Sequence, residues 1–125
     1  MMTIPEAEPL GPARPLEALV IAPCTGNTLA KLANGITDTS VTMAAKAHLR
    51  CGRPLVIAFA SNDGLSGNLR NIGTLLARKS VFFVPLGQDE PMGKPSSLVC
   101  DFGAIPDTLA AAMEGRQIQP LLLRG

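Results

Sequence analysis

The sequence contains no tryptophan or tyrosine, and its only large aromatic side chains are those of four phenylalanines. It therefore lacks the aromatic platforms on which the bases of single-stranded nucleic acids usually stack. An excess of one charge is also lacking, since 11 basic and 10 acidic residues leave a formal net charge of +1. Without a basic excess, little attracts a phosphate backbone or an anionic membrane. We expect neither a nucleic acid nor a membrane as a partner.

Long apolar runs, a secretion signal and closely spaced cysteines are missing as well. No apolar stretch approaches the roughly 20 residues that a membrane-spanning helix requires. The first residues, Met-Met-Thr-Ile-Pro, have neither the basic nor the apolar region of a signal peptide. The three cysteines, Cys24, Cys51 and Cys100, are odd in number and far apart. This usage predicts reduced thiols in a cytoplasmic protein and no metal site.

Proline, by contrast, is concentrated at the start of the chain. Four prolines fall within the first 15 residues, a density that excludes a helix or a central strand there. We interpret residues 1–17 as an extended arm or linker. Residues 18–125 are then one domain, and the 46% apolar and 17% charged composition of the chain is typical of globular proteins.

Patterns typical of strands and helices alternate after this arm. Apolar runs at 19–21, 55–60 and 81–84 predict strands buried on both faces, and Pro23 should end the first of them. Between them, apolar residues recur at helical spacing. The first such helix should place Ile36 on its apolar face and be closed by Gly35.

Two further helices are expected before the third strand. The Ala-rich stretch 41–50 should form one, with Ser40 as its N-cap. Residues 67–79 should form the other, with Leu69 facing the core and Gly73 in close packing or at a bend. This alternation predicts an α/β domain: a three-layer, Rossmann-like or flavodoxin-like parallel sheet with helices on both faces. Only three convincing strands are present, so we expect the N-terminal strands of such a sheet to be missing.

Small polar side chains follow two of the predicted strands. They are Thr25, Gly26, Asn27 and Thr28 after the first strand, and Ser61, Asn62 and Asp63 after the second. The carboxyl ends of parallel strands open on one edge of the sheet, which is where ligands bind in open α/β folds. Free N–H groups at a helix start favour an anionic ligand. The alternative is that these residues only cap a helix and form turns.

A few other side chains could carry chemistry. A helix N-terminus could activate Cys24, although a buried, inert thiol is the interpretation we favour. The only histidine, His48, fits a packing role better than acid–base catalysis. Asp63 could take a proton or orient a ring nitrogen, or it could simply form an Asx turn. Lys31 and Lys46 could meet substrate carboxylates or simply be solvated.

The block from Pro23 to Gly35 resembles the flavoprotein family of flavin-dependent cysteine decarboxylases and their relatives. The hallmark of that family is a Pro-x-Ser/Thr-x-Asn-Thr turn that runs into a helix with Lys, Ala and Gly at these spacings. The likeness extends from about residue 8 to residue 122 and includes Phe-Phe-x-Pro-x-Gly-Gln-Asp at 82–89.

This resemblance implies a flavin cofactor, FMN, and assigns roles to the residues at the strand ends. Thr25, Gly26, Asn27 and Thr28 would line the flavin phosphate, the ribityl chain and the ring edge. Ser61 and Asn62 would face the ring or the substrate. Asn27 and Asp63 would be the catalytic residues.

The resemblance also implies an oxidoreductase and the partners with which it acts. The protein would be a homo-oligomer that oxidises a dihydropyridine-type precursor to the small dicarboxylate pyridine-2,6-dicarboxylate during sporulation. A second, nicotinamide-dependent subunit would act in the same pathway.

Two departures from the family pattern leave other functions open. Decarboxylases of the family carry Pro-x-Met-Asn-x-x-Met where this chain has Ala-Ser-Asn-Asp-Gly-Leu at 60–65. Relatives also carry a strand, a Gly/Ser loop and a further βα unit upstream of the proline-rich segment, so we expect this chain to correspond to their C-terminal part. The alternatives are another flavin-family activity, such as decarboxylation or prenyl transfer to flavin, and a non-catalytic assembly component or fragment.

Overall fold

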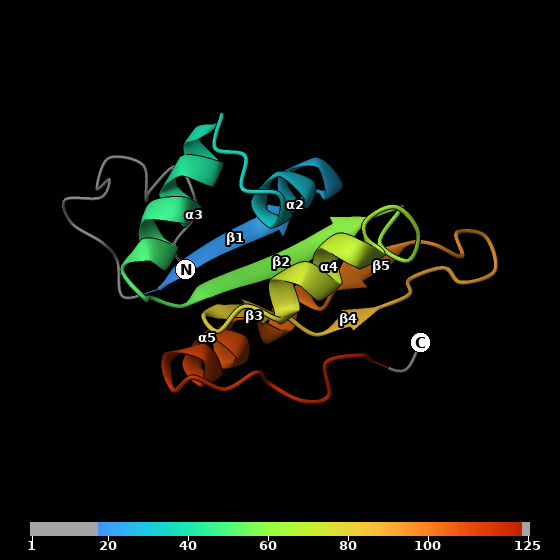
Figure 1. Cartoon of the computed structure of the whole chain (residues 1–125). Helices are drawn as coiled ribbons and strands as arrows, with labels where there is room; N and C mark the ends of the chain where they lie inside the picture. The colour runs from blue at the N-terminus through green and yellow to red at the C-terminus, as the bar shows by residue number, and fades with distance from the viewer. Residues whose placement is uncertain (1–17, 124–125) are drawn as a thin grey trace.

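The computed structural model describes residues 18–123, and the arm predicted over 1–17 lies outside them. Along the chain the elements are β1 (Leu19–Cys24), α2 (Gly26–Ala33), α3 (Ser40–Arg50), β2 (Leu55–Ser61), α4 (Leu69–Leu76), β3 (Val81–Phe83), β4 (Leu86–Gly87), β5 (Leu98–Cys100), the 3-10 helix η2 (Phe102–Ala104) and α5 (Ile105–Met113) (Figure 1). Within this part of the chain no helix is both long and apolar enough to cross a bilayer.

Strand β2 is the centre of the sheet. It runs parallel to β1 and β3, and its last residues pair with β5, which is antiparallel to both β2 and β4. The predicted α/β class is confirmed, but the sheet is mixed rather than parallel. The reason lies in the connection from β4 to β5, because residues 88–97 contain no crossover helix. A short connection of this kind returns the chain antiparallel, whereas a parallel neighbour needs a longer crossover.

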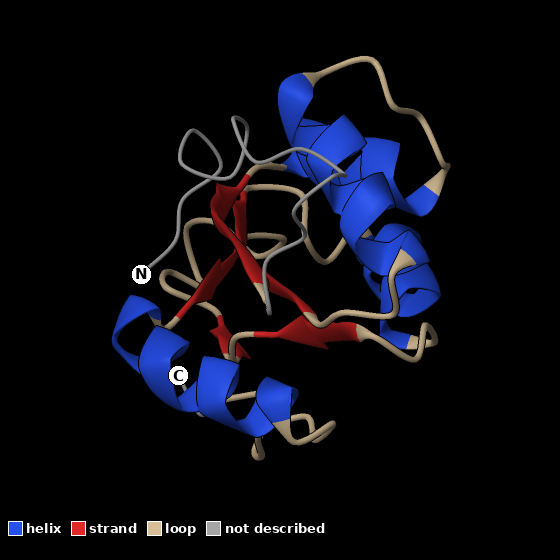
Figure 2. Cartoon of the chain, turned by 90° about the vertical axis from the view of Figure 1, so that its left-hand side faces the viewer, coloured by secondary structure: helices blue, strands red, loops and turns tan. Residues whose placement is uncertain are grey.

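Helices cover both faces of the sheet, as predicted. Figure 2 shows α2, α3 and α4 gathered on one face and α5 on the other. The core between these layers holds fully buried side chains from every layer, among them Leu29, Leu55, Phe59, Leu75 and Phe83. Burial on both faces explains why β2 is apolar almost throughout.

The first strand does not end at Pro23, and this expectation is wrong. β1 continues to Cys24, with a register shift against β2 between Ile21 and Cys24. Such an irregularity leaves a residue outside the ladder, so the missing N–H group of proline costs no sheet hydrogen bond. The extra residues carry β1 to the start of α2.

The caps of α2 and α3 are set by threonines. Thr25 Oγ1 accepts a hydrogen bond from Thr28 N at 3.3 Å and caps α2, and Gly35, at φ 71°, follows the helix end. Ile36 therefore lies beyond the helix and is 47% exposed, contrary to expectation. The N-cap of α3 is Thr39, not Ser40, because Thr39 and Thr42 bond each other's backbone N–H groups in a capping box.

Helix α4 is shorter than predicted, and its core-facing side differs. The preceding residues fold into turns around the Asp63 carbonyl, which accepts hydrogen bonds from Ser66 N at 3.1 Å and Asn68 N at 3.0 Å. Leu69 is consequently 50% exposed. A Cβ added to Gly73 would meet no atom within 4 Å, so the close packing predicted as one role of this glycine is not found.

His48 packs in the protein, as the sequence favoured, and this placement predicts a pH dependence. Its ring is buried, and its Nε2 lies 2.8 Å from the Pro54 carbonyl oxygen. Burial lowers the pKa of His48 from 6.5, and the nearby Arg53 contributes in the same direction. The unfolded chain therefore binds a proton before the folded one does. We expect stability to fall as the pH drops through about 6.5.

The measurement is the urea midpoint at about pH 7.5 and about pH 5.5. His48→Gln cannot titrate in this window, so its midpoint should change less than that of the wild type. Equal changes in the two proteins would show that His48 does not set the dependence.

Candidate functional site

The two polar segments predicted to lie together do meet. Residues Leu19 and Leu55 pair at the start of β1 and β2, and Cys24 pairs with Phe59 near their ends. Helix α2 begins two residues after β1, so its first turn lies against the end of β2. A Cβ built on Gly26 would stand 2.8 Å from Ser61 Oγ. The strand ends thus form one cluster of small polar groups.

Asp63 holds this cluster together. Its Oδ1 accepts hydrogen bonds from Ser61 Oγ and, at 3.0 Å, from Asn68 Nδ2. The Ser61 bond and then the Asn68 bond hold the pKa of the Asp63 carboxyl below its usual value. The group is therefore a carboxylate at neutral pH. It can accept a hydrogen bond or orient a donor, but it holds no proton to give to a substrate.

Sequence reasoning missed Asn68. Its side chain is buried, donates to Asp63 and accepts a hydrogen bond from Asn71 Nδ2 at 2.9 Å. Nothing in the sequence signals this role, because Asn68 falls inside the helix predicted over 67–79. In the structure it precedes α4 and makes no side-chain cap bond to that helix. Only the fold reveals that it supports Asp63.

Of the other residues predicted to form the site, some are hydrogen-bonded within the protein and others face solvent. Thr25 and Thr28 bond each other, with 3.2 Å between their hydroxyl oxygens, and Thr25 serves as a helix cap. Asn27 and Asn62 are exposed, and within residues 18–123 neither side chain makes a hydrogen bond. The N–H groups of Gly26 and Asn27 belong to the first turn of α2, where amides have no intrahelical acceptor. Together these groups offer donors to an anionic or polar ligand.

An apolar pocket lies between β1 and α5. It has a volume of about 480 Å³ and is lined by Ala22 and Pro23 of β1 and by side chains from η2 and α5, including Phe102 and Leu109. Phe102 is 46% exposed. A volume of this size is within the range of pockets that take drug-sized ligands.

The buried cysteines and the two lysines take no part in this cluster. Burial raises the pKa of Cys24 to about 12 and that of Cys100 to about 11, which favours the thiol form of both. The predicted burial of Cys24 is confirmed. Lys31, in the last turn of α2, pairs with Asp38 at 3.1 Å. It lines a different pocket, together with Lys46. In the described residues no three His, Cys, Asp or Glu side chains are arranged to hold a metal ion.

Comparison with known proteins decides the family. The family model described as Flavoprotein matches residues 3–119, which is most of the chain. The chain belongs to the flavoprotein family. The resemblance carried by the Pro23–Gly35 block and by residues 82–89 is thereby confirmed.

Within this family the chain is similar to the B subunit of dipicolinate synthase. It is 47% identical over 121 residues to that protein of Bacillus subtilis (strain 168), an alignment covering 97% of this chain and 60% of the relative. The crystal structure of the dipicolinate synthase B subunit from Bacillus halodurans C superposes with a TM-score of 0.90 at 48% identity, covering 98% of this chain and 63% of the other. The chain thus spans less than two thirds of the length of either relative.

More distant flavoproteins share parts of the chain. Flavin prenyltransferase UbiX of Methanothermobacter thermautotrophicus is 41% identical over 58 residues, 46% of this chain and 30% of that protein. The crystal structure of the FMN-dependent cysteine decarboxylase SpaF gives a TM-score of 0.59 at 29% identity, covering 85% of this chain and 57% of that one. Flavoprotein membership implies a flavin cofactor and a role related to enzymes.

Proposed function

We propose that this chain acts as the B subunit of a dipicolinate synthase, an FMN-dependent oxidoreductase. In this role it would help to convert a dihydrodipicolinate-type precursor to dipicolinate, pyridine-2,6-dicarboxylate, in sporulation. The observation that carries the proposal is the meeting of the first turn of α2 with the end of β2, where Gly26 lies against Ser61 and Asn68. The similarity to the B subunits of dipicolinate synthases supports the substrate.

The groups at the strand ends fit the polar parts of FMN. The backbone N–H groups of Gly26 and Asn27 and the hydroxyls of Thr25 and Thr28 would bind its phosphate and ribityl oxygens, because a helix N-terminus offers N–H donors and positive potential. The side-chain amide of Asn27 would bind the edge of the flavin ring. Ser61 and Asn62 would face the isoalloxazine ring or the substrate. The apolar pocket lined by Pro23, Phe102 and Leu109 would supply the apolar surface that a flavin ring requires.

FMN would supply hydride acceptance, and the residues of this chain would position the precursor. The amide groups of Asn27 and Asn62 are exposed and can donate to its two carboxylates. Asp63 accepts its side-chain hydrogen bonds on Oδ1 within the described residues, which leaves Oδ2 to accept one from a ring N–H. Asn27 and Asp63 are therefore the residues to which we assign contact with the reacting ring.

Partners and location complete the proposal. The names of the relatives mark them as one component of a synthase with more than one kind of subunit. We infer that the partner is the nicotinamide-dependent A subunit of dipicolinate synthase. We further propose a homo-oligomer, as the family resemblance implies, and a cytoplasmic location, with which three free cysteines are consistent.

Removal of the Asn27 amide tests the flavin site directly. We expect Asn27→Ala to lose at least about tenfold in FMN affinity, which corresponds to about 1.4 kcal/mol and is the contribution of one or two hydrogen bonds. Asn34→Ala is a matched control, because Asn34 is exposed and lies at the other end of α2. Flavin absorbance and fluorescence titration measure the effect. Equal FMN retention in Asn27→Ala and Asn34→Ala would remove Asn27 from the site.

Two alternatives follow from the family. The similarity to a flavin prenyltransferase favours another flavin-family reaction, which assays of dihydrodipicolinate oxidation and prenyl transfer would distinguish. The second alternative is a non-catalytic assembly role. A purified chain without flavin absorbance that still co-elutes with the synthase A subunit would favour that role.

A further inference from the structure

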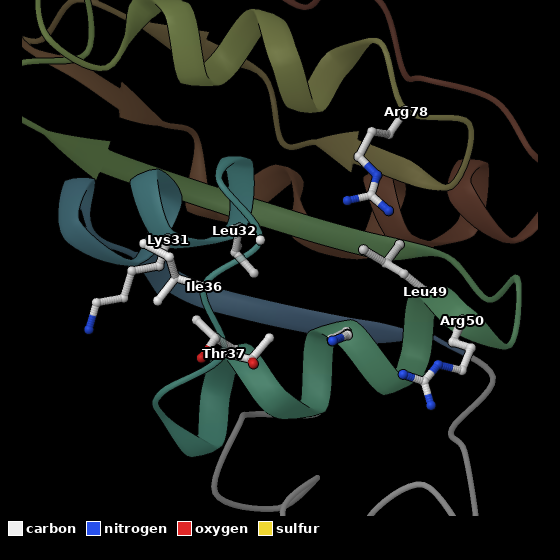
Figure 3. Close-up of a pocket in the computed structure, with 10 residues that line it drawn as sticks. Lys31, Leu32, Ile36, Thr37, Leu49, Arg50 and Arg78 are labelled. Atoms are coloured by element: carbon white, nitrogen blue, oxygen red, sulfur yellow. The ribbon is translucent and has the colours of Figure 1, made fainter.

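A second pocket lies at the opposite end of α2 from the strand-end cluster. It has a volume of about 390 Å³ and lies between the last turn of α2, the segment after it, α3 and Arg78, which follows α4 (Figure 3). Because an α-helix rises about 1.5 Å per residue, the length of α2 separates this pocket from Gly26 by roughly 10 Å. A ligand in this pocket would therefore not occupy the proposed flavin site.

The pocket is lined by positive charge. Four basic residues contribute to it, Lys31, Lys46, Arg50 and Arg78, and no acidic residue does. Lys31 is paired with Asp38, but no ion pair links Lys46, Arg50 or Arg78 to any residue in 18–123. Basic side chains in the last turns of α2 and α3 interact favourably with the negative ends of the helix dipoles. That effect does not account for Lys46 or Arg78, which come from other positions.

Apolar side chains form the rest of the lining. Leu32 is buried and Leu49 is half-buried. Ile36 lies in the segment after α2 and is 47% exposed. In Figure 3, Leu49 lies between Arg50 and Arg78, and Ile36 and Leu32 lie on the side towards Lys31. The pocket thus combines an apolar surface with two guanidinium groups, which suit planar oxyanions because they can bind them through two parallel hydrogen bonds.

We propose that this pocket binds a small organic anion that carries oxyanion groups on a flat apolar ring. Arg50 and Arg78 bind the oxyanion groups, Lys46 adds charge, and Ile36 and Leu49 contact the ring. Aromatic dicarboxylates and aryl phosphates share this chemistry. A metal cation does not, because no carboxylate lines the pocket.

Calorimetric titration at fixed ionic strength tests the proposal with three probes: pyridine-2,6-dicarboxylate, phenyl phosphate and the neutral pyridine-2,6-dicarboxamide. At least one of the two anions should bind, and the neutral dicarboxamide should not. The anion with the higher affinity shows whether the pocket takes an aromatic dicarboxylate or an aryl phosphate. Arg78→Gln and Arg50→Gln should each weaken that anion by at least about tenfold. Arg70→Gln removes the same charge from an exposed position on α4 outside the pocket. It should change the affinity by less than about twofold.

Several results would overturn the proposal. They are the absence of binding by either anion, equal binding of the neutral amide, and an effect of Arg70→Gln as large as that of Arg78→Gln. Anion binding that survives Arg78→Gln but is lost in Asn27→Ala would place the ligand at the strand ends instead. NMR shifts add a second readout, since an anion in this pocket should perturb Thr42 and Leu49 rather than Ser61. The FMN content of Arg78→Gln should equal that of the wild type, so failure here leaves the flavin proposal standing.

Discussion

Gly26→Ala is expected to destabilise the protein by about 1–3 kcal/mol, the usual cost of adding a methyl group to a tightly packed site. The new Cβ would lie 2.7 Å from Asn68 Nδ2 and 2.8 Å from Ser61 Oγ. Neither atom can yield freely, because both donate hydrogen bonds to Asp63 and Asn68 is buried. The cluster that we assign to FMN should be displaced with them, so flavin affinity should fall by at least about tenfold.

The same substitution elsewhere provides the control. Gly73 lies inside α4, and a Cβ there would meet no atom within 4 Å. Gly73→Ala should therefore stabilise the protein by about 0.5–1 kcal/mol, since alanine has the higher helix propensity. Urea unfolding gives both values. NMR titration adds a local readout, because loss of the Ser61 and Asn68 bonds should raise the pKa of Asp63 towards its ordinary value in Gly26→Ala. Similar stability in the two variants would show that the cluster tolerates the methyl group.

Gln117→Ala should lower the free energy of unfolding by about 2–4 kcal/mol. Gln117 lies 34 residues from Phe83 in sequence, yet its Oε1 accepts a hydrogen bond from Phe83 N at 2.8 Å and its Nε2 donates to Phe83 O at 2.7 Å. The side-chain amide of Gln117 thus makes the two backbone hydrogen bonds that a neighbouring strand would otherwise make to Phe83 of β3. Phe83 is fully buried, and each buried backbone group left unpaired costs about 1–3 kcal/mol. Part of this loss is offset because alanine, unlike glutamine, loses no side-chain rotamer entropy on folding.

Gln119→Ala is the matched control for this prediction. Gln119 is exposed, and its Oε1 accepts a hydrogen bond from Leu121 N at 3.1 Å, which water can replace. Its removal should cost less than about 0.5 kcal/mol. Urea midpoints report the global effect, and amide hydrogen exchange at Phe83 reports the local one. If the two variants unfold at the same urea concentration, the Gln117 bonds contribute nothing measurable.

The sequence by itself determined the class of the fold and the place of the candidate site. Apolar runs on both sides of helical patterns specify buried strands and covering helices, and threonine and glycine at the ends of α2 fix that helix locally. Parallel pairing of β1 and β2 then brings the residues after Cys24 and those after Ser61 to one edge. Each of these steps depends on short-range preferences, which a single sequence displays directly.

Only the tertiary structure decided which distant groups meet. It brought Gln117 to Phe83 and placed Arg78 in one pocket with Arg50. It set the local turn in which Asn68 donates to Asp63. It also made the sheet mixed and left Ile36 exposed beside that pocket. The physical reason is that such contacts depend on how whole elements pack against each other. A polar residue in a turn or at a helix end has the same local pattern whether it faces water or a partner far along the chain.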